Sequence, residues 1–183
     1  GVKQMETVGP SGEAILDYSV YDAIRAGFGK VVFVLNNAIF HDFKEKYNHK
    51  FGNIIEVEFV IQEIEDVPAG ITIPESRKKP WGTGHAVRSA RDVIQEPFVV
   101  INADDFYGKQ AYSSISQFIE TNDLNYAMYA YKLGKTLSNH GTVSRGICHV
   151  ESNLLIEINE NTSIKRGTET QIKSDQRLDL NED

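Results

Sequence analysis

Hydrophobic positions near the start of the chain switch between helical and strand-like spacing. Residues 14–26 place apolar side chains three and four positions apart, which predicts a helix that Gly27 ends. Residues 30–35 form a continuous apolar run, typical of a strand that is covered on both faces in a parallel sheet. Residues 39–51 carry aromatic rings at roughly helical spacing with Lys and Glu between them, which predicts a second helix.

The middle of the chain continues this alternation around one long connection. Residues 54–62 alternate and are rich in β-branched side chains, which predicts a strand. Residues 67–84 contain repeated Pro and Gly, and a connection of this length is usually functional or mobile. Helical spacing resumes over residues 86–95, and residues 98–103 then predict a strand that ends at two carboxylates.

The last third predicts a helix around residues 114–119, followed by strands at residues 126–133, 142–150 and 154–159. Alternating helices and strands favour an α/β fold with a doubly wound, mostly parallel sheet and helices on both faces. We therefore expect one domain over residues 1–166. Residues 167–183 are polar and are expected to be a loop or tail.

Composition limits the number of domains and the cellular compartment. A chain of 183 residues with 40% hydrophobic content suits a single core. No apolar run approaches the ~20 residues that cross a bilayer, and the first residues lack the layout of a signal peptide, so we expect a soluble cytoplasmic protein. Cys148 is the only cysteine, which excludes an internal disulfide and fits a reducing compartment; its strand-like surroundings favour a buried spectator over a nucleophile.

Charge argues against nucleic acid as a partner. The formal net charge is −7, and no cluster of Lys and Arg is dense enough to follow a phosphate backbone. The one basic cluster, at residues 77–79, lies in the long loop before Pro80. It is interpreted either as a solvated loop or as a local attraction for a triphosphate.

The carboxyl ends of the predicted strands are where ligands lie in open α/β sheets. Asp104 and Asp105 come directly after the strand at residues 98–103. Mg²⁺ is commonly bound by one or two carboxylates together with substrate phosphates, which suits Asp104 alone or with Asp105. The alternative is that one of them caps the next helix or turn. Their position at the strand end favours the metal.

A second candidate is the turn formed by Gly82, Thr83 and Gly84 at a helix start, which exposes backbone N–H groups to a ring or an anion. A Gly-x-Gly turn alone is as well explained by a plain loop. His85 follows; it is either a base or ligand, or a packed or capping residue.

These residues resemble the sugar-phosphate nucleotidyltransferases of the GT-A-like type. The resemblance rests on Lys3 with the run to Tyr18, on Gln62 with the turn "GTGHAV" at residues 82–87, on "DDFYG" at residues 104–108, and on Gly141. It implies that Lys3 contacts phosphate and that Gln62, Gly82, Thr83 and Gly84 hold the nucleotide. It further implies Asp104, with Asp105, as the Mg²⁺ site, and sugar-phosphate contacts at Tyr107, Gly108, Gly141 and Glu160.

Three departures from the family pattern stand beside the matches. The family's opening strand and glycine-rich loop precede the equivalent of Gly1, and its second metal carboxylate lies beyond Asp183, so we expect the domain to be incomplete at both ends. Asn161 stands where the family commonly has a basic residue after Glu160. Either Lys165 or Arg166 supplies that charge, or the acceptor differs from an ordinary sugar 1-phosphate.

The expected reaction is transfer of a nucleoside monophosphate from a nucleoside triphosphate to a phosphorylated small-molecule acceptor, with Mg²⁺ as cofactor and Lys3 and Asp104 as catalytic residues. Two alternatives stay open: a glycosyltransferase built on the same type of sheet, and a non-catalytic nucleotide-binding module. A homo-oligomer is compatible with the sequence. Neither the base nor the acceptor follows from it.

Overall fold

The computed structural model describes residues 6–166 and 172–174. Its contacts divide the chain into two compact units, residues 1–127 and residues 128–183, which are described one at a time. Lys3 lies outside the described residues, as does most of the stretch 167–183. The single domain predicted over residues 1–166 stays a prediction.

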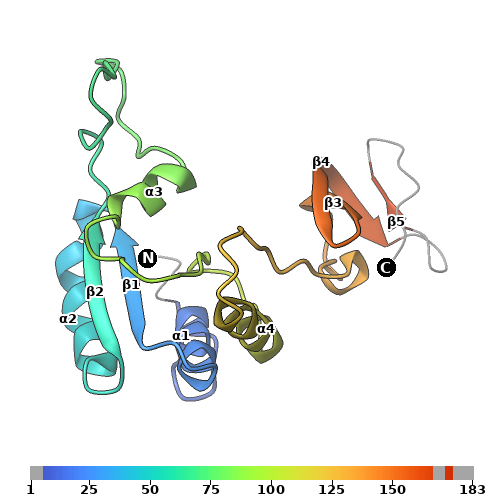
Figure 1. The fold of residues 1–183 in the computed structure, drawn as a ribbon, viewed down its shortest axis with the longest axis horizontal. Helices are drawn as coiled ribbons and strands as arrows, with labels where there is room; N and C mark the ends of the chain where they lie inside the picture. Colours follow the sequence, from blue (N-terminus) through green and yellow to red (C-terminus); the bar gives the residue numbers. More distant parts are fainter. Residues whose placement is uncertain (1–5, 167–171, 175–183) are drawn as a thin grey trace. The chain divides into compact units, whose positions relative to one another are not determined.

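The first unit contains mixed helices and strands (Figure 1). Strands β1 (Lys30–Leu35) and β2 (Glu56–Ile61) run parallel, in register from Lys30 opposite Glu56 to Leu35 opposite Ile61. The helical elements are α1 (Ile15–Arg25), η2 (Asn37–Ile39), α2 (Phe40–Phe51), α3 (Thr83–Ser89) and α4 (Lys109–Glu120). The α/β class is thus confirmed, with a parallel sheet of two strands. The larger doubly wound sheet stays a prediction.

The core of this unit lies where α1 and α2 meet one face of the two strands. The Phe33 ring stacks on Phe59 at 5.6 Å and meets Phe43 edge-on at 5.1 Å. Tyr47 is completely buried beside them. Aromatic pairs with this spacing add to the stabilisation from burying apolar area, which explains why the aromatic residues of α2 recur at helical spacing.

Charged and polar contacts fasten the helices around this core. The Asp17 carboxylate, on α1, accepts a hydrogen bond from the backbone N–H of Ala14 at 2.8 Å. The same oxygen lies 2.6 Å from Nζ of Lys50 on α2, which links the two helices. At the other end of α1, the Ser116 hydroxyl of α4 donates to the carbonyl of Ala26 at 2.7 Å.

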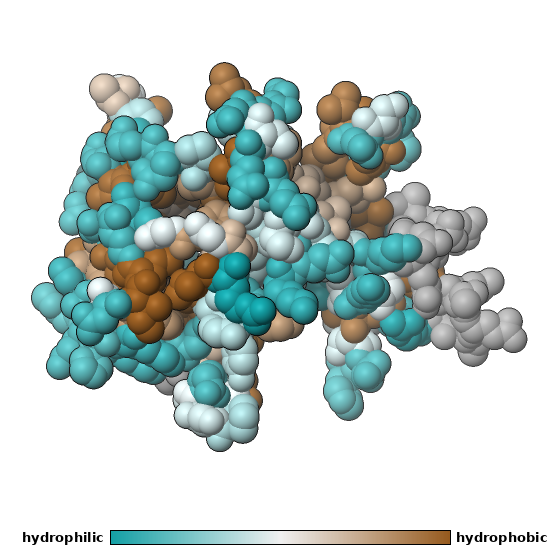
Figure 2. Space-filling view, turned by 60° about the horizontal axis from the view of Figure 1, so that its bottom comes forward, coloured by the Kyte–Doolittle hydropathy of each residue, from teal (hydrophilic) through white to brown (hydrophobic). Residues whose placement is uncertain are grey.

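Two predicted strands are wrong as hydrogen-bonded strands. Residues 98–103 and 126–133 form no ladder with another strand in the described part of the chain. Large apolar side chains there reach the surface; Val100 is 57% exposed and Tyr126 fully exposed. Apolar surface is visible between hydrophilic residues in the space-filling view (Figure 2). A strand needs a neighbour for its N–H and C=O groups, and the hydrophobic pattern alone does not supply one.

The other boundaries shift modestly. Helix α3 begins at Thr83, three residues before the predicted start, because the Gly82 carbonyl accepts the N–H groups of His85 and Ala86. It ends at Ser89 rather than at Gln95. A short helical turn, η3 (Leu133–Lys135), lies where the strand over residues 126–133 was expected to end.

The second unit is an antiparallel sheet. Strands β3 (Val143–Glu151) and β4 (Leu154–Arg166) pair across a two-residue turn, in which Ser152 and Asn153 both have positive φ, as tight hairpins require. Both predicted strands are confirmed, and β4 runs seven residues further than expected. Strand β5 (Ile172–Lys173) pairs with β4, and Ile172 is buried, although these residues fall in the stretch expected to be a polar loop or tail.

Two further findings concern the predictions made for Cys148 and for membrane-spanning segments. Cys148 lies on β3 and is partly exposed rather than buried. Among the described residues, no helix is both long enough and apolar enough to span a membrane.

Candidate functional site

The side-chain amide of Gln62 is held against the start of α3. Gln62 follows β2, and its backbone N–H extends the parallel ladder by donating to the Leu35 carbonyl at 2.8 Å. Its Nε2 lies 3.1 Å from the Trp81 carbonyl and 3.4 Å from the Gly82 carbonyl. The structure thereby brings together the strand end and the glycine turn that the sequence placed in one nucleotide site.

His85 completes this cluster. Its Nδ1 lies 3.1 Å from Nε2 of Gln62, and its Nε2 lies 2.8 Å from the backbone carbonyl of Asp66. A carbonyl only accepts and an amide NH₂ only donates, so both bonds form when the ring is neutral with its proton on Nε2. The sequence left two roles open for His85, a base or ligand and a packed or capping residue. Its hydrogen bonds within the protein support the packed role.

The Asp66 carboxylate is held from α3 and the residues after it. Arg91 lies 2.5 Å from Oδ2, and Arg88 lies 3.7 Å from Oδ1. The hydrogen bond from Arg91 lowers the pKa of Asp66, and the charge of Arg88 acts in the same direction. Loop residue 66 is therefore fixed by its carboxylate as well as by its carbonyl.

Trp81 closes the long loop over residues 67–80. Its indole N–H donates to the Ile64 carbonyl at 2.9 Å, and the Arg77 guanidinium lies 4.0 Å from its ring centre. Arg77 is thus engaged with an aromatic face, which leaves Lys78 and Lys79 as the members of the basic cluster without a described partner.

The glycines of the turn leave room beside this cluster. A Cβ atom added at Gly82 or Gly84 meets no atom within 4 Å. Both glycines and Thr83 are exposed. A ligand can therefore approach the turn closely. Because a Cβ atom would also fit at both positions, the protein's own packing does not require glycine there.

The loop that holds the two carboxylates is closed by Asp105. The side-chain amide of Asn102 donates to Oδ2 of Asp105 at 2.8 Å, and the backbone N–H of Asn102 donates to the Tyr107 hydroxyl at 2.9 Å. Burial raises the pKa of Tyr107, and the Asp105 charge and a hydrogen bond to its carboxylate act in the same direction. Asn102, Asp105 and Tyr107 form one hydrogen-bonded loop.

Asp104 has a different environment. Its side chain is exposed, and its carboxylate has no hydrogen bond or ion pair within the described part of the chain. Nowhere among the described residues do three or more His, Cys, Asp or Glu side chains gather as a ready-made metal site. The two residues therefore differ. Asp105 closes the loop through a hydrogen bond, as a capping residue does, whereas the Asp104 carboxylate is exposed to solvent and accessible to a ligand.

Gly108 ends this loop in a conformation that favours glycine. Its φ is +75°, and α4 begins at the next residue. Before it, Phe106 is 66% exposed and meets the Tyr18 ring edge-on at 6.3 Å. Gly108 is therefore required by the backbone whether or not a ligand lies against it.

Two of the four predicted acceptor residues, Gly141 and Glu160, belong to the second unit. Gly141 has a φ of +87°, and a Cβ atom there would meet nothing within 4 Å. Glu160 is exposed on β4, opposite Gly146 of β3. Their role in binding a sugar phosphate stays a prediction.

Asn161 is a buried structural residue. It is fully buried, its Nδ2 donates to the Asn159 carbonyl at 3.0 Å, and its Oδ1 accepts from the Ser174 hydroxyl at 3.3 Å. Arg166 lies 2.5 Å from the Gly134 carbonyl, whereas Lys165 is exposed without a described partner. Of the two replacements that the sequence suggested for a basic residue at position 161, Lys165 is the one whose charge is available.

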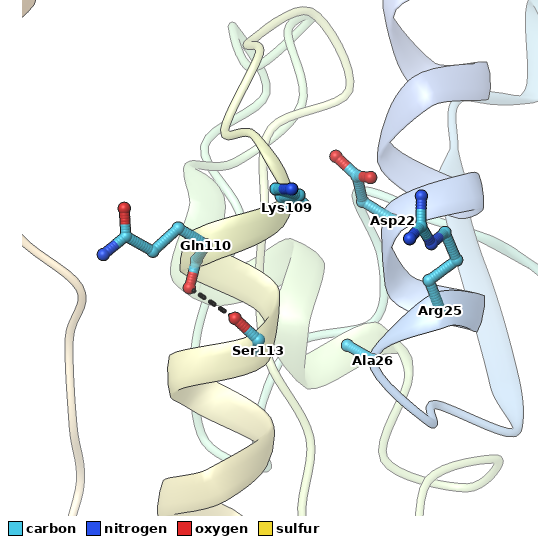
Figure 3. Close-up of a pocket in the computed structure, with 6 residues that line it drawn as sticks. All are labelled: Asp22, Arg25, Ala26, Lys109, Gln110 and Ser113. Carbon is cyan, nitrogen blue, oxygen red and sulfur yellow. Dashed lines mark hydrogen bonds between the residues drawn. The ribbon is translucent and has the colours of Figure 1, made fainter.

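A groove between α1 and α4 lies outside the predicted site. It is lined by charged side chains of both helices, and the Ser113 hydroxyl at its edge donates to the Gln110 carbonyl at 3.1 Å (Figure 3). The lining residues are Asp22, Arg25, Ala26, Lys109, Gln110 and Ser113. Its mixture of opposite charges is typical of a solvated surface.

Comparison of the sequence with protein-family models identifies the family of the chain. The family model described as nucleotidyl transferase matches residues 2–161. The chain belongs to the nucleotidyl transferase family. None of the curated proteins compared with the chain matches it.

Family membership gives the general chemistry of this nucleotidyl transferase. Enzymes of the family bind nucleoside triphosphates and sugar phosphates, and they commonly use a divalent metal. The matched range contains Gln62, the turn at residues 82–84 and the loop at residues 102–108. It therefore covers both hydrogen-bonded clusters described above.

Three residues of these clusters were not identified from the sequence as functional. Asp66 and Trp81 hold the long loop through backbone carbonyls and stacking, and Asn102 closes the carboxylate loop. A backbone acceptor has no side-chain signal, so no pattern indicated the Asp66 contact. The position of Asn102, three residues before Asp105, could have suggested a closed turn.

Proposed function

We propose that this protein transfers a nucleoside monophosphate from a nucleoside triphosphate to a sugar 1-phosphate or a similar phosphorylated metabolite. An oxygen of the acceptor phosphate attacks the α-phosphorus, a new P–O bond forms there, and the bond to pyrophosphate breaks. We also propose that the reaction takes place in the cytoplasm, with nucleotide and acceptor as the partners and no nucleic acid.

The observation that supports the proposal most is the contrast between the two adjacent carboxylates inside the matched family range. Asp105 is bound within the protein, whereas the Asp104 carboxylate is exposed and unpaired among the described residues. A hard cation takes oxygen ligands and is often held by a single protein carboxylate plus substrate phosphates. The donor chemistry of Asp104 fits Mg²⁺, which would neutralise charge on the phosphates when bound.

The protein's own residues contribute binding and orientation. Gln62, Gly82, Thr83 and Gly84 hold the nucleotide, with Gln62 fixed by carbonyls of the turn itself. Lys3 contacts phosphate and supplies positive charge in the transition state. Tyr107, Gly108, Gly141 and Glu160 hold the acceptor. Positioning of this kind carries most of the catalysis of phosphoryl transfer.

The test measures pyrophosphate release by the intact protein with Mg²⁺, over a panel of nucleoside triphosphates and sugar 1-phosphates. We expect turnover with at least one pair, and we expect Asp104→Ala to lower it at least about a hundredfold, because charge stabilisation by a metal is worth several kcal/mol. Glu45→Ala, which removes another exposed carboxylate, serves as the control and keeps the wild-type rate.

Two results would overturn the proposal. If the wild-type protein consumes nucleotide sugars without releasing pyrophosphate, the reaction is glycosyl transfer. If it binds nucleotides and Mg²⁺ but produces nothing with any acceptor, the protein is a binding module. Wild-type turnover by Asp104→Ala would instead remove that residue from the mechanism.

A further inference from the structure

Gln62 has only one polar side-chain atom left for a ligand. Its Nε2 faces three protein acceptors, namely the Trp81 carbonyl at 3.1 Å, the Gly82 carbonyl at 3.4 Å and Nδ1 of His85 at 3.1 Å. An amide nitrogen carries two hydrogens, so these contacts use its whole donor capacity. Oε1 has no hydrogen bond within the described part of the chain.

The orientation of this amide is set by its neighbours. A rotation that exchanges the two amide atoms would place Oε1 against two carbonyl oxygens and the lone pair of His85 Nδ1. Three acceptors facing an acceptor would lose every bond and repel. The arrangement therefore favours a single orientation, with the nitrogen toward the protein.

His85 holds its own place in this arrangement through a different bond. Its Nε2 donates to the backbone carbonyl of Asp66 at 2.8 Å, which makes Nδ1 the acceptor of the ring. The Ser89 hydroxyl donates to the His85 carbonyl at 3.0 Å, but it does not contact the ring. The ring thus connects the residue at the end of β2 to the loop that follows it.

We propose that His85 is a positioning residue that fixes the Gln62 amide with its nitrogen toward the protein, so that Gln62 meets the nucleobase through Oε1 as a hydrogen-bond acceptor. This inference rests on the proposed function. The group recognised is therefore an N–H donor on the base. Without the His85 acceptor, the Trp81 and Gly82 carbonyls still face Nε2, but two acceptors instead of three hold the amide in this orientation. The weaker hold on the amide reduces the discrimination between bases.

Two substitutions separate the two bonds of the ring. His85→Asn keeps an acceptor near the position of Nδ1 but is too short to reach Asp66. His85→Gln keeps a donor that reaches the Asp66 carbonyl but has no acceptor near Nδ1. Ser89→Ala removes the neighbouring hydroxyl bond without touching the ring and serves as a matched control.

The experiment measures kcat/KM of the intact protein for each of the four common nucleoside triphosphates with one acceptor. We expect the ratio between the best and the next-best nucleotide to fall about five- to tenfold in His85→Gln, through KM rather than kcat, since one oriented hydrogen bond is worth about 1 kcal/mol. In His85→Asn and Ser89→Ala the ratio stays within about twofold of the wild type.

The outcomes distinguish this inference from the proposed function. A wild-type protein that turns over no nucleotide contradicts the proposed function itself. A discriminating wild type whose His85→Gln variant keeps its selectivity overturns the positioning role alone. Equal losses for all nucleotides in both His85 variants also overturn it, because they indicate a purely structural role for the ring.

Discussion

The side-chain amide of Asn102 lies 2.8 Å from the Asp105 carboxylate, while the neighbouring Asp104 carboxylate is exposed and unpaired among the described residues. Two carboxylates that are adjacent in sequence therefore have different contacts. The Tyr107 hydroxyl, which accepts the backbone N–H of Asn102, joins the same loop and limits its freedom. We expect the two residues to respond differently to substitution.

Replacing Asp105 should affect the position of the loop rather than the binding of metal. We expect Asp105→Ala to lower kcat/KM about tenfold, because the loss of roughly one hydrogen bond lets the loop shift, with the Mg²⁺ concentration for half-maximal rate unchanged. Asp105→Asn, which still accepts from Asn102, should keep most of the activity. Metal titrations of the pyrophosphate-release rate check both.

The comparison with Asp104 decides this division of roles. Asp104→Asn should raise the Mg²⁺ concentration needed for half-maximal rate, since a neutral amide is a weaker ligand than a carboxylate. A shift of the same size in Asp105→Asn would mean that both carboxylates meet the metal.

Local patterns identified the elements whose interactions are mostly local. The helix over residues 40–51 and the strand over residues 30–35 follow from spacing, because Phe33, Phe43 and Tyr47 bury one another within a single compact cluster. The strand predicted over residues 98–103 has the right composition but no paired neighbour. Pairing depends on residues distant in sequence, which a local pattern does not contain.

The candidate site was predictable to a similar degree. The motifs gave Gln62, the glycine turn and the carboxylate pair, since these residue types carry chemistry that a sequence can show. They did not give the direction of the Gln62 amide or the difference between Asp104 and Asp105. Both depend on contacts with backbone atoms and neighbouring side chains.

The contact between Lys50 and Asp17 should stabilise the first unit measurably. Asp17 is buried and only its Oδ2 is bonded, by Lys50 and by the Ala14 N–H. We expect Lys50→Ala to lower the free energy of unfolding by about 1–3 kcal/mol, because it leaves a buried carboxylate with less compensation. Urea unfolding followed by circular dichroism measures it. Lys46→Ala, an exposed lysine of the same helix, should change stability by much less.

Restoring the family's basic residue at position 161 should not improve activity. Asn161 is fully buried, and a lysine there would bury a charge and lose the bonds to Asn159 and Ser174. We expect Asn161→Lys to lower the thermal midpoint by several degrees, whereas Thr162→Lys, at the exposed neighbouring position, leaves it nearly unchanged. A stable, more active Asn161→Lys variant would show that the side chain reaches the acceptor.

Tyr47 should make the protein lose stability in alkali. Burial raises the pKa of Tyr47 to about 12 from its ordinary value of 10.0, and the charge of Asp17 acts in the same direction. The unfolded chain therefore releases this proton near pH 10, whereas the folded chain keeps it until about pH 12. Between these values the unfolded state binds fewer protons, so the free energy of unfolding falls by up to about 1.4 kcal/mol per pH unit.

The variant Tyr47→Phe isolates this effect. Its hydroxyl is buried and has no hydrogen-bond partner, so removing it should leave stability near pH 8 equal or slightly higher. Tyr107 and Tyr112, whose pKa values are also raised by burial, are present in both proteins, so their effect cancels in the difference. We expect the two curves of unfolding free energy against pH to separate above pH 10, with the wild type falling faster. Parallel curves up to pH 12 would show that the Tyr47 hydroxyl ionises equally easily in the folded and unfolded chains.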